Sequence, residues 1–143
     1  MVTLHAEEGN LVKYFNEKFE EEGRIRSNDW CIKNWSKAIP NFTAKIAVDS
    51  AIAMAKHVDV PLCIVHISTK EEVESISKAK REGQKVYAEA ALHYLLISHE
   101  DNERLGPFSK IDPPIRSRQD IEGIWQGIAT GTVDTLCTLY VVC

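Results

Sequence analysis

Strand-like and helix-like patterns alternate along this chain. Four short runs have the length and side-chain pattern of β-strands, and they lie at residues 1–7, 62–69, 85–90 and 133–138. Between them, apolar residues recur at the three- and four-residue spacing of an amphipathic helix, as Leu11, Phe15 and Phe19 do after the first run. Four strands separated by helices predict parallel β/α units joined by right-handed crossovers.

Short-range signals predict where several helices begin and end. Asn10 is the expected N-cap of the first helix, which we expect to end near Gly23. Thr69 precedes Glu72 by three residues, the spacing of a capping box, and this predicts a helix from Thr69 to about Glu82. Another helix is expected around residues 46–55, before the second strand.

The other segments are harder to assign from their pattern. Residues 24–40 have no clear period and include Trp30 and Trp35, so we expect an irregular loop there. Residues 110–116 contain two consecutive prolines, which predict a rigid loop. The last helix repeats apolar residues, and we expect its face with Trp125 and Ile128 to lie in the core.

Two histidines stand at the downstream ends of strand-like runs. His5 follows Val2-Thr3-Leu4, and His66 follows Leu62-Cys63-Ile64-Val65. In parallel α/β sheets the carboxyl ends of the strands form the active site, because side chains from several strands converge there. A single histidine at such a place is more often a hydrogen-bonded structural residue than a ligand. Two in matching positions favour a shared site.

Composition limits the possible functions. The chain has 143 residues, 44% of them hydrophobic, which predicts one domain spanning residues 1–143. Its net charge of -4, without a basic cluster, argues against nucleic acid as a partner. No apolar run approaches the roughly 20 residues of a membrane helix, and no signal sequence is evident, so we expect a cytoplasmic protein without a membrane partner.

Six sequence blocks in a fixed order resemble one enzyme family. They lie at residues 5–9, 40–42, 64–69, 87–89, 110–116 and 131–135. Their order and spacing resemble the later half of the catalytic domain of the cyclic amidohydrolases, the group that contains dihydropyrimidinase, hydantoinase, allantoinase and dihydroorotase. The resemblance implies an α/β fold: a partial (β/α)8 TIM barrel of about four β/α units.

The resemblance also implies a metal site and a substrate. Complete members hold two divalent metals, usually zinc, with ligands from the first, fourth, fifth, sixth and eighth strands. By this resemblance His5 is the fifth-strand ligand and His66 the sixth-strand ligand, while Asp112 and Pro113 belong to the loop that meets the substrate. The implied substrate is a small cyclic amide, opened by water that the metals activate. A homo-oligomer is also expected.

Departures from the family pattern leave alternatives open. The position of the family's catalytic aspartate holds Leu139, so no residue is assigned as catalytic. The ligands of the first and fourth strands have no counterpart, which leaves at most one weak zinc site. We therefore expect a fragment or diverged member of this hydrolase family that is inactive by itself. The alternatives are a non-catalytic, dihydropyrimidinase-related scaffold and an independent small α/β domain without metal.

Overall fold

The computed structural model describes residues 1–24 and 34–138 of the 143-residue chain. The strands are β1 (Val2–Leu4), β2 (Leu62–Ile64), β3 (Val86–Ala91) and β4 (Thr135–Cys137). The α-helices are α1 (Gly9–Glu21), α3 (Asn41–His57), α4 (Lys70–Arg81), α5 (His93–Leu96), α6 (Asn102–Leu105) and α7 (Arg118–Ala129). Two 3₁₀ turns, η1 (His99–Asp101) and η2 (Gly106–Ser109), flank α6.

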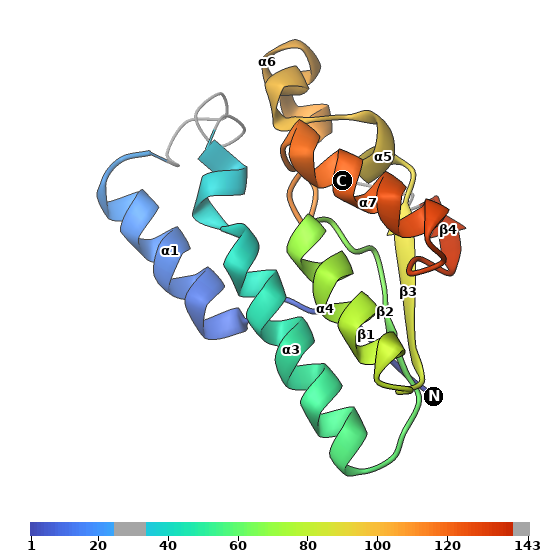
Figure 1. Cartoon of the computed structure of the whole chain (residues 1–143). Coiled ribbons are helices and arrows are strands. Elements are labelled where there is room, and N and C mark those ends of the chain that lie inside the picture. The colour runs from blue at the N-terminus through green and yellow to red at the C-terminus, as the bar shows by residue number, and fades with distance from the viewer. Residues whose placement is uncertain (25–33, 139–143) are drawn as a thin grey trace.

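The four strands form one parallel sheet in the order β1-β2-β3-β4. Because spatial order follows chain order without a reversal, the described sheet lacks the switch point of a doubly wound fold. Figure 1 shows α3, α4 and α7 lying side by side over one face of the sheet. A sequential parallel sheet with its helices on one face is an arc of a β/α barrel, so the expected fold class, a partial TIM barrel, is confirmed.

The core fills the space between the sheet and this helical layer. Its centre consists of fully buried residues from five elements: Val48, Ile64, Ile76, Ala88 and Ile124. Alternate residues of a strand point to opposite faces. The row formed by Thr3, Cys63 and Tyr87 therefore lies on the other face, and Tyr87 is 42% exposed there. That open face corresponds to the interior of a complete barrel.

The capping signals were partly correct. Thr69 and Glu72 form the predicted capping box at the start of α4. The predicted cap of α1 is wrong, because Glu8 is the N-cap and its carboxylate accepts from the Leu11 N–H at 2.7 Å, while Asn10 lies inside the first turn. A carboxylate at an N-terminus also complements the helix dipole, so Glu8 can replace Asn10 as cap.

The expected loop at residues 24–40 is only partly testable. Residues 34–38 are helical, so the loop assignment is wrong there. Trp30 lies outside the described residues. In the part of the chain that the structure describes, no helix is both long and apolar enough to cross a bilayer.

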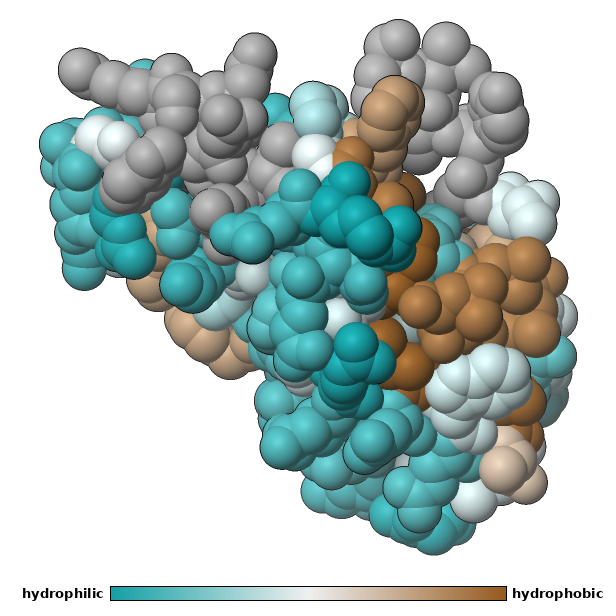
Figure 2. All heavy atoms as spheres, turned by 90° about the horizontal axis from the view of Figure 1, so that it is seen from above, coloured by the Kyte–Doolittle hydropathy of each residue, from teal (hydrophilic) through white to brown (hydrophobic). Residues whose placement is uncertain are grey.

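The orientation of α7 differs from the expected one. Ile124 is fully buried and Ile128 packs against the core, whereas Trp125 is 48% exposed and its indole N–H donates to the Leu95 carbonyl at 3.1 Å. One residue advances the helix by about 100°, which turns Trp125 out of the core-facing stripe. The prediction that Trp125 lies in the core is therefore wrong. Figure 2 shows apolar surface on the side where Figure 1 places α7 and β4.

Candidate functional site

His5 and His66 meet at the carboxyl edge of two adjacent strands. His5 follows β1, His66 follows β2, and these strands pair in parallel. The Nδ1 atom of His5 lies 3.1 Å from Nε2 of His66, and the ring centroids are 4.8 Å apart. Two histidines at matching strand ends predict neighbouring side chains at the carboxyl edge of two adjacent parallel strands, and this position is confirmed.

The backbone turns sharply at His66. Its φ is +42°, in the left-handed region that residues with a Cβ rarely adopt. Before the turn, Val65 donates its N–H to the Leu4 carbonyl at 3.1 Å, and after it Ile67 donates to the Glu89 carbonyl at 2.9 Å. Hydrogen bonds to the segments of β1 and β3 thus fix the chain on both sides of His66 as it leaves β2. They place the imidazole at the carboxyl edge of the sheet.

Glu7 joins His5 to a buried arginine. Its carboxylate Oε2 lies 3.2 Å from His5 Nε2, and its Oε1 lies 3.6 Å from Arg116 Nη2. The side chains of Glu7 and Arg116 are 7% and 2% exposed. A buried charge is costly unless it is paired, and each of these two groups supplies the counter-charge of the other.

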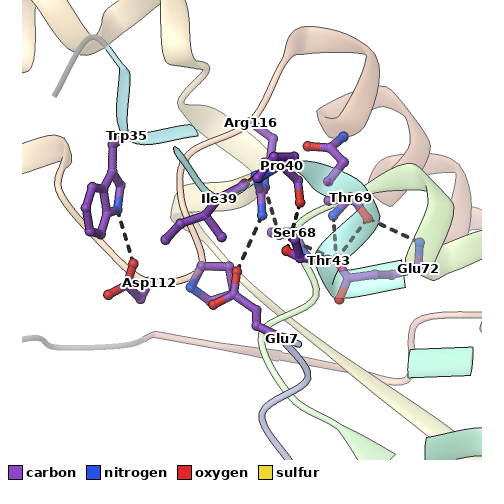
Figure 3. Close-up of polar contacts among 12 residues, drawn as sticks. Glu7, Trp35, Ile39, Pro40, Thr43, Ser68, Thr69, Glu72, Asp112 and Arg116 are labelled. Atoms are coloured by element: carbon purple, nitrogen blue, oxygen red, sulfur yellow. Dashed lines mark hydrogen bonds and ion pairs between the residues drawn. The ribbon is translucent and has the colours of Figure 1, made fainter. Parts of the chain in front are cut away.

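Arg116 holds three loops together at this edge. Its Nε donates to Ser68 Oγ at 3.3 Å, and its Nη1 donates to the Ile39 carbonyl. Ser68 itself is bound to Glu72, the fully buried capping residue of α4. Figure 3 shows Arg116 above Glu7, Ile39 and Ser68, so segments that follow β1, precede α3 and follow β2 all contact one side chain.

Asp112 and Pro113 lie beside these residues. The peptide bond between them is cis, and the Pro113 carbonyl accepts from the Tyr94 hydroxyl at 2.5 Å. Trp35 donates its indole N–H to Asp112 Oδ1 at 3.1 Å and to the Ile111 carbonyl at 3.0 Å (Figure 3). The loop is therefore tied on both sides, with Asp112 at the surface and Pro113 buried.

The electrostatics of the site differ between its two histidines. The hydrogen bond to Glu7 raises the pKa of His5, with burial acting against it. Burial lowers the pKa of His66, and the neighbouring His5 adds to this effect. Desolvation raises the pKa of Asp112, and the negative charge of Glu7 adds to this shift. His66 is therefore the more readily neutral ring, which is the form that binds metal.

The two histidines fit part of a zinc site. Two nitrogens bound to one tetrahedral zinc at 2.0–2.1 Å are separated by about 3.3 Å. The observed 3.1 Å between His5 Nδ1 and His66 Nε2 is close to this value. Among the described residues, however, no group of three or more His, Cys, Asp or Glu side chains is placed to hold a metal. The residues present thus supply two ligands, one fewer than a catalytic zinc site takes from protein.

The sequence predictions identified the histidines but not the buried Arg116 that joins the segments around them. His5, His66 and the loop with Asp112 and Pro113 are brought to one edge of the sheet. Arg116 was recognised only as the end of a sequence block, and no periodicity indicates that an arginine is buried. Leu139, at the position of the family's aspartate, lies outside the described residues.

Comparisons with known proteins point to one group of enzymes. No protein-family model matches the chain. Allantoinases of Salmonella paratyphi B and Salmonella newport are each 30% identical to it over 142 residues, which is 99% of this chain and 30% of the relative. The chain therefore spans about 30% of the length of the curated relatives it matches.

Solved structures give the same result. The L-hydantoinase (dihydropyrimidinase) of Arthrobacter aurescens superimposes with a TM-score of 0.87 at 29% identity, covering 95% of this chain and 29% of the hydantoinase. The dihydropyrimidinase of Brevibacillus agri has a TM-score of 0.87 at 24% identity, covering 96% and 29%. The second likeness concerns the fold alone.

Proposed function

We propose that this chain, which is similar to the cyclic amidohydrolases over nearly its whole length, forms the two-histidine side of a metal-dependent active site that is complete only in a longer polypeptide. The observation that carries the proposal is the 3.1 Å approach of His5 Nδ1 and His66 Nε2. Both rings come from adjacent strand ends, where barrel enzymes place their ligands.

Each residue of the site has a proposed task. His5 and His66 hold a metal ion, which we propose to be zinc and which supplies water activation and carbonyl polarisation when bound. Asp112 and Pro113 contact a small cyclic amide, since their loop lies beside the histidines and is fixed by Tyr94 and Trp35. We also propose that the complete protein is a homo-oligomer located in the cytoplasm.

The isolated chain is proposed to be inactive. Two protein ligands hold zinc weakly, and no group of three or more possible ligands is placed to hold a second metal among the described residues. The position of the family's aspartate is Leu139, whose side chain cannot accept a proton. Loss of a positioned proton-transfer group costs about 10²- to 10⁴-fold in rate by itself.

Leu139 favours a second candidate function. A chain that retains His5 and His66 but lacks the aspartate fits a non-catalytic scaffold of the same fold. The two candidates differ in one measurable property, which is whether restoring the aspartate restores hydrolysis once the rest of the barrel is supplied.

A chimeric enzyme tests both candidates. The 142-residue matching segment of the Salmonella paratyphi B allantoinase is replaced by this chain, with and without the substitution Leu139→Asp. Ring opening of allantoin, hydantoin and dihydrouracil is followed with zinc or manganese, next to the unmodified 143-residue chain. We expect turnover only from the Leu139→Asp chimera, at least about 10²-fold above the Leu139 chimera.

Controls make the outcomes distinct. His66→Ala in the active chimera should abolish turnover, whereas Glu17→Gln, an exposed change on α1, should not alter it. A folded, metal-loaded Leu139→Asp chimera without activity would favour the scaffold candidate. Metal-dependent turnover by the unmodified chain, lost in His66→Ala, would refute the proposal that a longer polypeptide is required.

A further inference from the structure

A continuous line of contacts runs from the buried arginine to the second histidine. Arg116 Nη2 lies 3.6 Å from Glu7 Oε1, Glu7 Oε2 lies 3.2 Å from His5 Nε2, and His5 Nδ1 lies 3.1 Å from His66 Nε2. Glu7 and His5 each make two contacts in this line, and the two contacts use different atoms of the residue. The two carboxylate oxygens of Glu7 and the two ring nitrogens of His5 therefore have separate partners.

The Arg116 side of this line is rigid. Arg116 is 2% exposed, and its other nitrogens donate to Ser68 Oγ and to the Ile39 carbonyl. The guanidinium thus cannot rotate without breaking bonds to two other segments. Glu7 is 7% exposed and faces this fixed positive charge with one oxygen, so its second oxygen is directed at His5.

The hydrogen-bonding capacities of the groups then determine where the proton of neutral His5 lies. An ionised carboxylate only accepts hydrogen bonds, so Nε2 of His5 must carry the proton that faces Glu7. The lone pair of a neutral ring is then on Nδ1, the atom that faces His66. Without metal, His66 Nε2–H donates to this lone pair, so both ring nitrogens of His5 have a partner, while Nδ1 of His66 is buried without one among the described residues.

We propose that Glu7, oriented by Arg116, is a positioning residue that holds His5 in the Nε2–H tautomer and so presents Nδ1 as its metal-binding atom. The tautomer follows from contacts within this chain. Only the metal-binding role of the exposed lone pair rests on the proposed function. In metal sites, a carboxylate that is hydrogen-bonded to the other nitrogen of a ligating histidine fixes the ring and strengthens metal binding.

The substitution Glu7→Gln gives a specific test. An amide has one oxygen and one NH₂ group, and Arg116 has no acceptor, so the oxygen must face Arg116 and the NH₂ must face His5. His5 Nε2 then has to accept, and the ring proton moves to Nδ1. We therefore expect the tautomer of His5 to reverse in Glu7→Gln, whereas a merely structural ion pair would change stability and leave the tautomer unchanged.

The readout is the ¹⁵N chemical shift of the ring nitrogens. The metal-free 143-residue chain is labelled at its histidines and measured about two units above the ordinary histidine pKa of ~6.5, in solution or by magic-angle spinning if it self-associates. The His5 signals are those lost in His5→Gln. The wild-type chain should show Nε2–H at His5, and an Nδ1–H tautomer would overturn the proposal even if Glu7→Gln does not fold.

Glu89→Gln is the matched control. Glu89 also places a negative charge near the site, where it acts on His66, but it has no hydrogen bond to His5. We expect this variant to keep the His5 tautomer. If it reverses the tautomer as Glu7→Gln does, or if Glu7→Gln leaves the tautomer unchanged, the proposal is wrong.

Zinc titration separates this inference from the proposed function. Because the isolated chain supplies only two ligands, the titration uses the Leu139→Asp chimera, where competition with a chromogenic chelator should show zinc binding that weakens about 10- to 100-fold when Glu7→Gln is added. Failure of this chimera to bind zinc would count against the proposed function and leave the tautomer result standing. Equal zinc affinity in the two proteins, with a reversed tautomer, would overturn the role of Glu7 in presenting Nδ1.

Discussion

His66 combines a side chain in the candidate site with a strained backbone. A left-handed conformation costs a residue with a Cβ about 1–2 kcal/mol, and only glycine adopts it freely. At φ +42° a glycine would relieve this strain, while alanine would keep it. The flanking hydrogen bonds of Val65 and Ile67 hold the chain in this unfavourable conformation.

Comparison of His66→Gly with His66→Ala tests this strain. Both variants lose the imidazole, so their difference isolates the backbone. We expect His66→Gly to have the larger free energy of unfolding, by about 1 kcal/mol, in urea denaturation followed by circular dichroism. At an ordinary helical position glycine is the less stable of the two, so a larger unfolding free energy for His66→Ala would show that the backbone at His66 is unstrained.

His93 gives stability a pH dependence. Burial lowers the pKa of His93, and the neighbouring His66 adds to this, so the folded chain favours the neutral ring. A histidine with a lowered pKa contributes stability that is present above its unfolded pKa of ~6.5 and is lost as the pH falls below it. We expect the free energy of unfolding of the wild-type chain to fall between about pH 7.5 and pH 5.5, and His93→Gln to reduce that fall.

His57 provides the comparison for His93. It is exposed at the end of α3, so His57→Gln should leave the pH profile as it is in the wild-type chain. Parallel profiles for the wild type and His93→Gln would contradict a neutral, half-buried His93.

At the scale of elements, α4 and α7 pack closely because α7 carries glycines where it meets α4. A Cβ on Gly123 would lie 2.4 Å from Lys70 Cβ and 3.0 Å from the Lys70 Cα. A Cβ on Gly127 would lie 2.8 Å from Val73 Cγ1. Glycine lowers helix propensity, so its presence at both contacts reflects the spacing of the two helices.

Gly123→Ala should therefore destabilise the chain. Helix propensity alone predicts a gain of up to about 1 kcal/mol, but the clash is with the Lys70 Cβ, which can move only together with its backbone, and overpacking costs about 1–3 kcal/mol. Gly9→Ala on α1 is the matched control, because its Cβ would meet open space. We expect a lower urea midpoint for Gly123→Ala and an unchanged or higher one for Gly9→Ala; a gain in both would show that the helices can separate at little cost.

At the scale of the molecule, the sheet has two outer strands, β1 and β4, each paired on one side only in the described part of the chain. Val2 and Leu136 on these strands are each 51% exposed. Leu92 and Leu96 of the α5 region and Trp125 of α7 add apolar surface, and Figure 2 shows such surface on the side of α7 and β4. Unpaired edges and apolar patches of this kind promote association.

The isolated chain should therefore self-associate or bind a hydrophobic dye. We expect oligomers in size-exclusion chromatography with light scattering, and a shift toward monomer in Leu136→Lys, since a charge on an edge strand opposes pairing. Lys56→Ala, a change on the exposed surface of α3, is the control. A clean monomer without dye binding would contradict the proposal that further barrel strands cover these edges.

The sequence by itself determined the strand and helix alternation, the capping box of α4 and the positions of His5 and His66 at strand ends. These signals are local, because hydrophobic period and capping depend on residues a few positions apart. Local signals also produced the errors: Asn10 was preferred over Glu8 as a cap, and the apolar character of Trp125 was read as burial although the helix turns it outward.

Only the tertiary structure decided how the site is held. The contacts of Arg116 with Glu7, Ser68 and Ile39 join residues 48 to 109 positions apart, and no short pattern encodes such a meeting. The 3.1 Å between His5 and His66 likewise depends on the register of β1 with β2. Strand pairing and the burial of a charge are set by the whole fold, so the chemistry of the site was readable from residue types while its geometry was not.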